Sequence, residues 1–85
     1  MIKIFADFNN KDEQGRVRLS TVGSLRDVAE HKSELREGLE VILYTPDEFE
    51  MLGTLVFDLG MWKGIPHLET IRYYDENPLR PGEGD

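Results

Sequence analysis

Residues 39–58, which read LEVILYTPDEFEMLGTLVFD, decide the fold of this chain. In the first part, alternate positions carry Leu39, Val41 and Leu43, and this period of two is typical of a strand with one buried face. Pro and Asp follow at positions 46 and 47 and mark a turn. The alternation resumes over residues 51–58, where Gly53 indicates a bend. The stretch therefore predicts two strands joined by a tight turn.

The N-terminal residues show the same period of two. Asn, Asp and Gly residues between positions 9 and 15 favour a turn, and the alternation returns over residues 16–20. We therefore expect residues 2–8 and 16–20 to form a hairpin. The alternation places Phe5 on the face turned away from the core. The core-facing positions of the first strand are Ile2, Ile4, Ala6 and Phe8.

One short helix is expected after this hairpin. Ser24 and Asp27 stand three residues apart, as an N-cap and its reciprocating acidic residue do. The apolar spacing that follows predicts a helix over about residues 25–32. Farther along the chain, residues 62–65 are expected to form a short strand and residues 68–71 a single helical turn.

The length bounds the domain organisation. A chain of 85 residues has room for one small domain with a thin core. We expect residues 1–74 to form a single mostly β domain of about five strands and one short helix. Such a small sheet would curl to cover its own edges. Residues 75–85 are expected to be a flexible acidic tail, because they carry almost nothing to bury.

Three short motifs resemble parts of SH3 domains. Residues 5–8 (Phe-Ala-Asp-Phe) are similar to the aromatic-Asp-aromatic element of that family, and Trp62 with residues 65–66 (Ile-Pro) to its Trp…Ile-Pro element. Residues 37–41 (Glu-Gly-Leu-Glu-Val) resemble the acidic-Gly entry to a strand in SH3-like barrels. The family's Tyr after Ile-Pro is replaced by His67. The resemblance implies a small SH3-like barrel.

The start of the chain also resembles small uncharacterised bacterial proteins. These begin with a similar Ile-Phe-Ala-Asp-Phe-Asn-Asn pattern, followed by Gly-Arg-Val-Arg-Leu, which residues 4–10 and 15–19 match here. This second resemblance implies the same fold class and no function.

Composition excludes several classes of function. The chain has no cysteine, which rules out disulfides, thiolate nucleophiles and Cys-based metal sites and fits a reducing cytoplasm. Its formal net charge of -7 does not favour nucleic acids or anionic membranes as partners. The N-terminal residues lack the pattern of a secretory signal, and the longest uncharged apolar stretch, residues 41–45, is too short for a bilayer. We therefore expect a cytoplasmic protein with no membrane association.

No pattern of catalytic residues emerges from the sequence. His31 and His67 have no Ser or Asp in a recognisable triad context, and adjacent carboxylates in turns point apart. We therefore expect no enzyme activity and no cofactor.

Asp7, Asn9 and Asp12 carry side-chain oxygens close together in the sequence, as a cation site would require. The spacing of a calcium loop fails, because counting from Asn10 puts Thr21 where the bidentate Glu belongs. A turn rich in Asn and Asp is the better interpretation, and no metal site is predicted.

Two surfaces remain as candidates for binding. Exposed aromatic side chains are typical of interface hot spots, so a protein or peptide partner, or a second copy of the chain, is the leading hypothesis. The alternatives are an acidic inhibitor or antitoxin-like protein that covers the basic site of a nucleic-acid enzyme, and a weak RNA- or DNA-binding barrel. Whether Trp62 is exposed or belongs to the core stays open from the sequence. The candidate residues are Phe5, Tyr44, Trp62 and Tyr73 for the protein partner, and Lys3, Arg16 and Arg18 for nucleic acid.

Overall fold

The computed structural model describes residues 1–74, and the predicted tail of residues 75–85 lies outside the described residues. The described part is mostly β, as the sequence predicts, with a single α-helix and two short 3₁₀ turns. The elements in chain order are β1 (Lys3–Phe5), β2 (Val17–Arg18), α1 (Val22–Glu30), η1 (Lys32–Glu34), β3 (Glu40–Thr45), β4 (Phe49–Asp58), β5 (Met61–Pro66), η2 (Leu68–Thr70) and β6 (Arg72–Tyr73).

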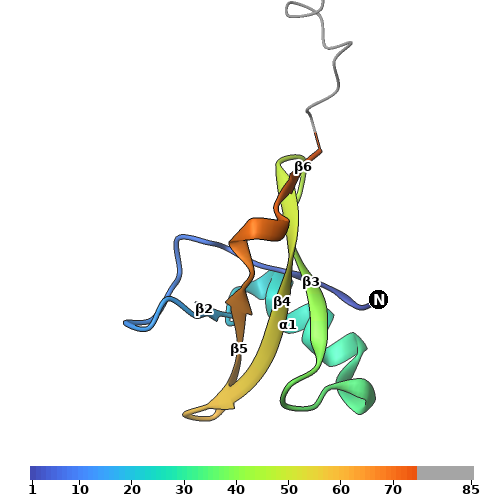
Figure 1. Cartoon of the computed structure of the whole chain (residues 1–85). Helices are drawn as coiled ribbons and strands as arrows, with labels where there is room; N and C mark the ends of the chain where they lie inside the picture. Colours follow the sequence, from blue (N-terminus) through green and yellow to red (C-terminus); the bar gives the residue numbers. More distant parts are fainter. Residues whose placement is uncertain (75–85) are drawn as a thin grey trace, which may run out of the picture.

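The strands form one curled sheet that resembles half a barrel (Figure 1). The strand order is β1-β3-β4-β5-β2, and β6 pairs with β4. The long strand β4 is the centre of this arrangement, because its first half pairs with β3 and its second half with β5. The predicted pair of strands over residues 39–58 is thus confirmed as the β3–β4 hairpin, and the predicted strand over residues 62–65 corresponds to β5.

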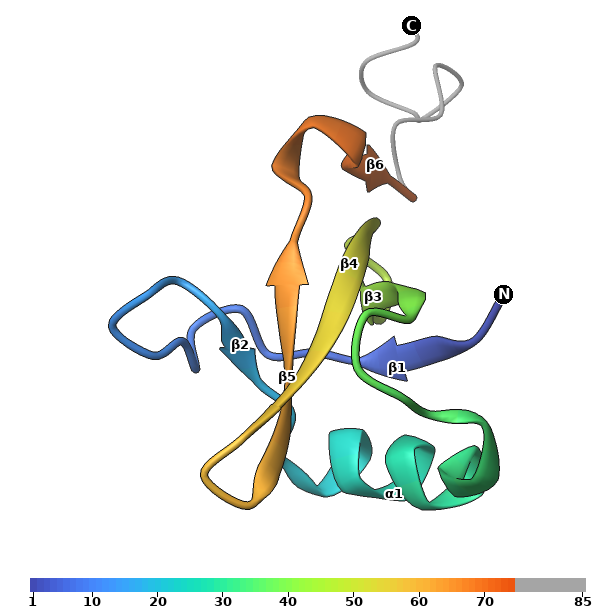
Figure 2. The same cartoon turned by 60° about the horizontal axis from the view of Figure 1, so that its bottom comes forward.

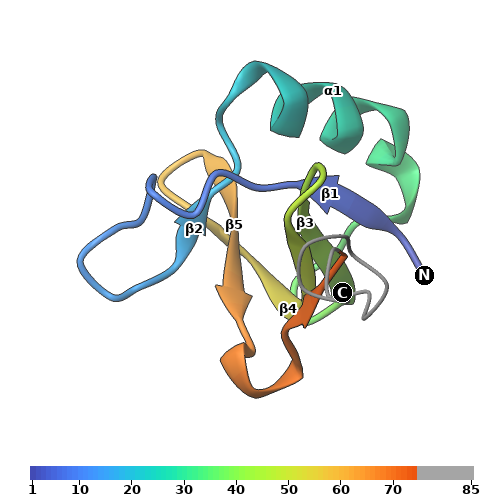
Figure 3. The same ribbon diagram turned by 90° about the horizontal axis from the view of Figure 1, so that it is seen from above.

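The predicted hairpin between residues 2–8 and 16–20 is wrong. Strand β1 pairs in parallel with β3, with Ile4 opposite Leu43, whereas β2 pairs with β5 at the other end of the sheet. The chain after β1 crosses the open side of the half-barrel to reach β2 (Figure 3). Alternation shows that a strand has two unlike faces, but it does not say which neighbour the strand pairs with.

A tight turn precedes β2, as the Asn and Asp residues predict. Lys11 forms a bridge with Val17, and the Asp12 carboxylate accepts the backbone N–H of Gln14 at 2.8 Å and of Arg16 at 2.9 Å. This use of a carboxylate on nearby backbone groups is typical of an Asx turn. The hairpin in this region is therefore local, formed by residues 10–18 alone.

The core lies inside the curl of the sheet. It joins both ends of the strand order, because Ile4 and Ala6 from the N-terminal segment meet Val17 and Leu19 of the β2 region. The predicted core positions of residues 2–8 agree with this, although Ile2 and Phe8 are only partly buried. The fully enclosed apolar residues are Ile4, Ala6, Val17, Leu19, Val41, Leu43 and Leu55.

The helix begins earlier than the sequence suggests and buries polar residues. Its N-cap is Thr21, whose hydroxyl accepts the N–H of Ser24, so the predicted N-cap at Ser24 is wrong. Leu25, an apolar residue in the first half of the helix, is 54% exposed. The buried helix residues are Ser24 and Asp27, which contact the edge of β1 instead of the core: Asp27 accepts the N–H of Phe5 at 2.9 Å, and the Ser24 hydroxyl donates to its carbonyl.

This contact explains the position of the helix. α1 runs beside β1 on the side away from β3, where another strand would otherwise add (Figures 2 and 3). Its two polar side chains take the place of the backbone groups of a neighbouring strand. The parallel edge strand is therefore closed to strand addition at Phe5.

Side chains also cap β4 where a neighbouring strand is missing. The Glu37 carboxylate accepts the backbone N–H of Phe57 at 2.7 Å. On the other edge, the Thr70 hydroxyl accepts the N–H of Leu52 at 2.9 Å, which fixes η2 against the strand. Unpaired strand edges are the usual sites of unwanted association, so these caps protect the sheet at the positions they occupy.

Candidate functional site

A hollow lined by three phenylalanines lies between the segment after β1 and the β3–β4 turn. It encloses about 310 Å³. We call it the aromatic groove, and its lining residues are Phe5, Ala6, Asp7, Phe8, Asn9, Thr45, Glu48 and Phe49.

Aromatic rings contact one another along this groove and beyond both of its ends. The rings of Phe8 and Phe49 lie 5.3 Å apart, and Phe49 in turn meets Tyr73 edge to face at 5.7 Å. At the other end, Phe5 meets Tyr44 edge to face at 6.1 Å. These are the distances at which aromatic pairs attract each other. The groove therefore has a firm apolar floor that continues onto β6.

Two carboxylates stand among the lining residues. Asp7 accepts the N–H of Asn9 at 3.0 Å, and Glu48 is exposed on the β3–β4 turn. Neither takes part in any of the ion pairs found within residues 1–74. Because no cation of the described residues pairs with either carboxylate, the groove suits a ligand that combines apolar groups with a cation.

Three of the four aromatic residues singled out from the sequence lie in or beside this groove. Phe5 lines it, Tyr44 contacts Phe5, and Tyr73 is 54% exposed at its other end. Phe5 and Tyr44 are less free than alternation suggests, because α1 covers them. A Cβ atom at Gly23 would lie 3.0 Å from Cγ of Phe5, and the Tyr44 hydroxyl donates to Asp27 at 3.2 Å.

The pKa values of two tyrosine hydroxyls are raised on this side of the molecule. Burial raises the pKa of Tyr44, and the Asp27 carboxylate raises it further. Burial also raises the pKa of Tyr74 to about 12, together with its hydrogen bond to Glu50 at 2.8 Å. That same hydrogen bond lowers the pKa of Glu50, which also pairs with Lys3 at 3.4 Å. Tyr74 and Lys3 thus fasten the end of β6 to the sheet.

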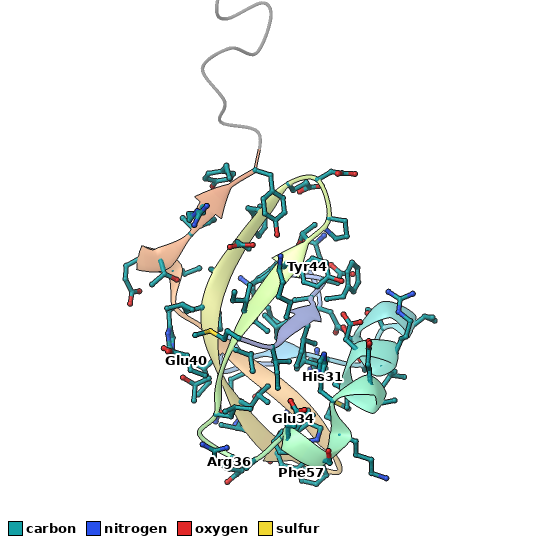
Figure 4. The ribbon with its side chains drawn as sticks, turned by 90° about the vertical axis from the view of Figure 1, so that its right-hand side faces the viewer. His31, Glu34, Arg36, Glu40, Tyr44 and Phe57 are labelled. Atoms are coloured by element: carbon teal, nitrogen blue, oxygen red, sulfur yellow. The ribbon has the colours of Figure 1, made fainter. Side chains whose placement is uncertain are left out.

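Trp62 belongs to a different end of the molecule. It is half-buried against the core, and its ring meets Phe57 edge to face at 5.0 Å. In Figure 4, Phe57 lies at the bottom of the molecule and Tyr44 lies well above it. The structure therefore does not bring Trp62 together with the other three aromatic candidates, and it answers the question left open by the sequence in favour of packing.

The three cations of the nucleic-acid alternative are not brought together either. The expectation that Lys3 lies on the strand next to Arg16 and Arg18 is wrong, because β1 and β2 stand at opposite ends of the strand order. Arg16 is paired with Asp12 at 2.7 Å and with Asp58 at 2.9 Å. Arg18 donates to a backbone carbonyl of the preceding turn at 2.7 Å. A stripe of free cations for phosphates does not form.

Arg16 is part of a compact cluster of two cations and two carboxylates. Lys63, only 4% exposed, completes the cluster with contacts to Asp58 at 2.9 Å and Asp12 at 3.1 Å. The Lys63 hydrogen bond lowers the pKa of Asp58. Burial raises the pKa of Asp12, but hydrogen bonds from Arg16 and Lys63 outweigh it and hold that pKa well below its ordinary value. The charges balance within the cluster, which ties the turn before β2 to the β4–β5 hairpin.

One histidine has neighbours that its sequence context did not indicate. Thr54 Oγ1 lies 2.9 Å from His67 Nε2, and Glu40 lies 3.9 Å from Nδ1. The order of hydroxyl, imidazole and carboxylate is that of a hydrolase triad, but the carboxylate lies beyond hydrogen-bond distance. The contact joins η2 to β4. Within residues 1–74, the one ion pair of His31 is with Glu34, at 3.8 Å.

Sequence reasoning missed Phe8 and Phe49 as site residues. Alternation assigned Phe8 to the core, and the strand beginning at residue 51 left Phe49 in a turn. Phe49 is the first residue of β4 and Phe8 lies in the turn after β1, where a side chain that packs against the core also borders the surface. The acidic character of the groove comes from turns far apart in the sequence, so no local pattern could reveal it.

The chain was compared with family models, curated proteins and solved structures. No family model, no curated protein and no solved structure matches the chain. Among the described residues, no helix is both long and apolar enough to cross a membrane.

Proposed function

We propose that this chain is a non-enzymatic binding module that takes a segment of a protein or peptide partner in its aromatic groove. The observation that carries the proposal is the continuous contact of Phe8, Phe49 and Tyr73 beside two carboxylates that no cation of the described chain neutralises. The partner segment would present apolar side chains to the rings and a Lys or Arg to Asp7 and Glu48.

The capped edges support side-chain recognition rather than strand addition. Phe5, Leu52 and Phe57 each have the backbone N–H bonded to a side chain of the same molecule. A partner strand would have to displace these bonds before forming its own. A groove of side chains requires no such exchange.

The test compares two aromatic residues that are equally exposed. Tyr73 is 54% exposed beside the groove, and Phe57 is 50% exposed at the far end. The immobilised full chain is used to capture a partner from a lysate of its source cells, and the affinity of that partner is then measured for both variants. We expect Tyr73→Ala to weaken binding by about tenfold or more, since hot-spot aromatics contribute more than about 1.4 kcal/mol. Phe57→Ala should leave the affinity within about threefold, on the scale of neutral interface contacts.

Equal losses in the two variants, with circular dichroism showing both folded, would overturn the groove as the binding site. So would loss in Phe57→Ala alone.

A second candidate function is an acidic inhibitor or antitoxin-like protein. Its support is the charge distribution: the net charge is -7, while Lys3, Arg16 and Lys63 are already paired with carboxylates of the same chain. Such a surface would suit the basic site of a nucleic-acid enzyme, with long-range attraction speeding association.

A further inference from the structure

We propose that the aromatic groove binds a methylated lysine side chain of the protein partner. The inference rests on the proposed function, because it names the group that the same groove takes. A methylated lysine keeps its positive charge and surrounds the nitrogen with apolar methyl groups. The lining offers what such a group requires, namely aromatic rings beside two carboxylates that form no ion pair within residues 1–74.

The size of the groove suits one side chain. Its volume is about 310 Å³. Sites for small ligands span roughly 300–1,000 Å³, so this groove is at the lower end of the range. A single long side chain can enter it, while the neighbouring residues of the partner would lie outside, where Tyr73 is exposed.

The aromatic rings are inclined to one another so that a cation can meet their faces. The planes of Phe8 and Phe49 form an angle of 56°, and those of Phe49 and Tyr73 an angle of 72°. Steeply inclined pairs leave ring faces outside the contact, whereas parallel stacking would cover them. Phe8 and Phe49 are half-buried, so a cation between the lining residues would lose part of its water. Cation–π attraction is strongest when the cation is desolvated in this way.

Several backbone oxygens of the lining already accept a hydrogen bond within the chain. They are the carbonyl oxygens of Phe5, Ala6, Asp7 and Thr45. An unmodified lysine ammonium has three N–H donors and is strongly hydrated, so entering this groove would cost it hydrogen bonds to water. Each methyl group removes one donor and keeps the charge. The groove therefore favours the methylated side chain over the unmodified one.

The carboxylates favour a lysine side chain over the choline headgroup of a lipid. The stem of a lysine is uncharged, whereas phosphocholine carries a phosphate close to its quaternary ammonium. That phosphate would approach Asp7 and Glu48, two groups of like charge. The cation Lys3 is paired with Glu50 at 3.4 Å and is not free to offset this repulsion.

The experiment titrates three small probes into the full chain and follows its amide NMR signals. The probes are N-acetyl-trimethyllysine methylamide, the unmodified lysine equivalent and a neutral analogue with a tert-butyl group in place of the trimethylammonium. We expect the trimethyllysine probe to bind with a dissociation constant on the order of 1 mM, as weak ligands of this size do. It should bind about fivefold or more tightly than either of the other probes, the scale of a cation–π contact. The amide signals that move should be those of Asp7, Phe8, Glu48 and Phe49.

Two pairs of variants locate the interaction. Phe49→Leu keeps an apolar side chain but removes a ring, so it should abolish the preference for the trimethyllysine probe over the neutral one. Phe57→Leu, at the far end of the molecule, should retain that preference. Glu48→Gln should weaken binding of the trimethyllysine probe about two- to fivefold, whereas Glu13→Gln, an exposed position of another turn, should not change it.

Four results would overturn the inference. The lysine or the neutral probe could bind as tightly as the trimethyllysine probe, or no signal could move at about 10 mM probe, well above the expected dissociation constant. The moving signals could lie around Phe57 and Trp62 instead of the groove. Glycerophosphocholine could bind more tightly than the trimethyllysine probe, which would assign the groove to a lipid headgroup.

Failure of this inference is distinguishable from failure of the proposed function. If the probes show no preference for methylation while Tyr73→Ala still loses the captured partner, only the methylated lysine is excluded as the bound group. If Tyr73→Ala retains the partner, the proposed function falls, whatever the probes do.

Discussion

Leu43 shows how a single side chain sets the sequence of the strands around it. Its side chain is fully buried and rests on the backbone of the next two strands in the sheet, at Gly53 of β4 and Gly64 of β5. A Cβ atom at Gly53 would lie 2.9 Å from Cγ of Leu43 and 3.2 Å from the carbonyl oxygen of Ile65. Gly53 is thus required by close approach, at the point where β4 passes from pairing with β3 to pairing with β5.

We expect Gly53→Ala to lower the free energy of unfolding by about 1–3 kcal/mol, the usual cost of overpacking a core. Urea unfolding followed by circular dichroism measures this. The reason is steric, so the same substitution should cost less in a Leu43→Ala background, where the space is open. Equal costs in both backgrounds would contradict the explanation.

At the scale of elements, α1 acts as a cover for β1 more than as a layer of the core. Its contacts to Phe5 come from Ser24 and Asp27, both buried polar residues, and Val28 is the helix residue that adds an apolar contact to the core. A helix that presents polar side chains to a strand edge satisfies backbone groups that would otherwise attract another chain.

Removing the Asp27 carboxylate from this contact should lower the free energy of unfolding. We expect Asp27→Ala to destabilise the fold by about 1–3 kcal/mol, because the N–H of Phe5 and the hydroxyl of Tyr44 both lose their acceptor. The control is Glu30→Ala, an exposed position of the same helix, which should change stability by less than about 0.5 kcal/mol. Urea unfolding of both variants provides the measurement, and similar midpoints for the two would argue against the capping role.

Some of these elements could be predicted from the sequence and others could not. The β3–β4 hairpin and β5 were predictable within about two residues, because period-two alternation and turn residues are local signals. The partner of β1 was not predictable, since alternation does not say which strand is the neighbour, and the start of α1 was not, since Thr21 rather than Ser24 caps it. At the site, individual exposed aromatic residues could be predicted from alternation. Their arrangement could not, because the groove forms only where the residues after β1 meet the β3–β4 turn.

For the whole molecule, closure of the half-barrel depends on charge as well as on the core. The cluster of Asp12, Arg16, Asp58 and Lys63 holds the turn before β2 against the β4–β5 hairpin. The pKa values of both carboxylates are lowered in the folded protein, so their contribution is complete above the pKa of an unfolded Asp and is lost as the pH falls below it.

We therefore expect stability to decline as the pH is lowered below about 4, the ordinary range of an Asp side chain. Urea midpoints between pH 7 and pH 2 measure the decline, which should be shallower in Asp12→Asn. Glu13→Gln is the matched control, because Glu13 is exposed next to Asp12 and has no ion pair within residues 1–74. An equally shallow profile in Glu13→Gln would mean that general charge repulsion, and not the cluster, sets the acid response.

The net charge of -7 also separates the two candidate functions, because they differ in what salt should do to the complex. Burial of apolar groups against Phe8, Phe49 and Tyr73 is insensitive to ionic strength, whereas attraction between whole surfaces is screened over a Debye length of about 4–5 Å near 0.5 M salt. We expect the affinity of the captured partner to fall by less than about tenfold between 0.1 and 0.5 M salt, with most of that change in the association rate, because a rim pair to Asp7 or Glu48 contributes mainly to steering. Surface plasmon resonance over this range measures both rates. A steep loss, accompanied by unchanged binding of Tyr73→Ala, would instead assign the partner to the acidic surface and favour the inhibitor.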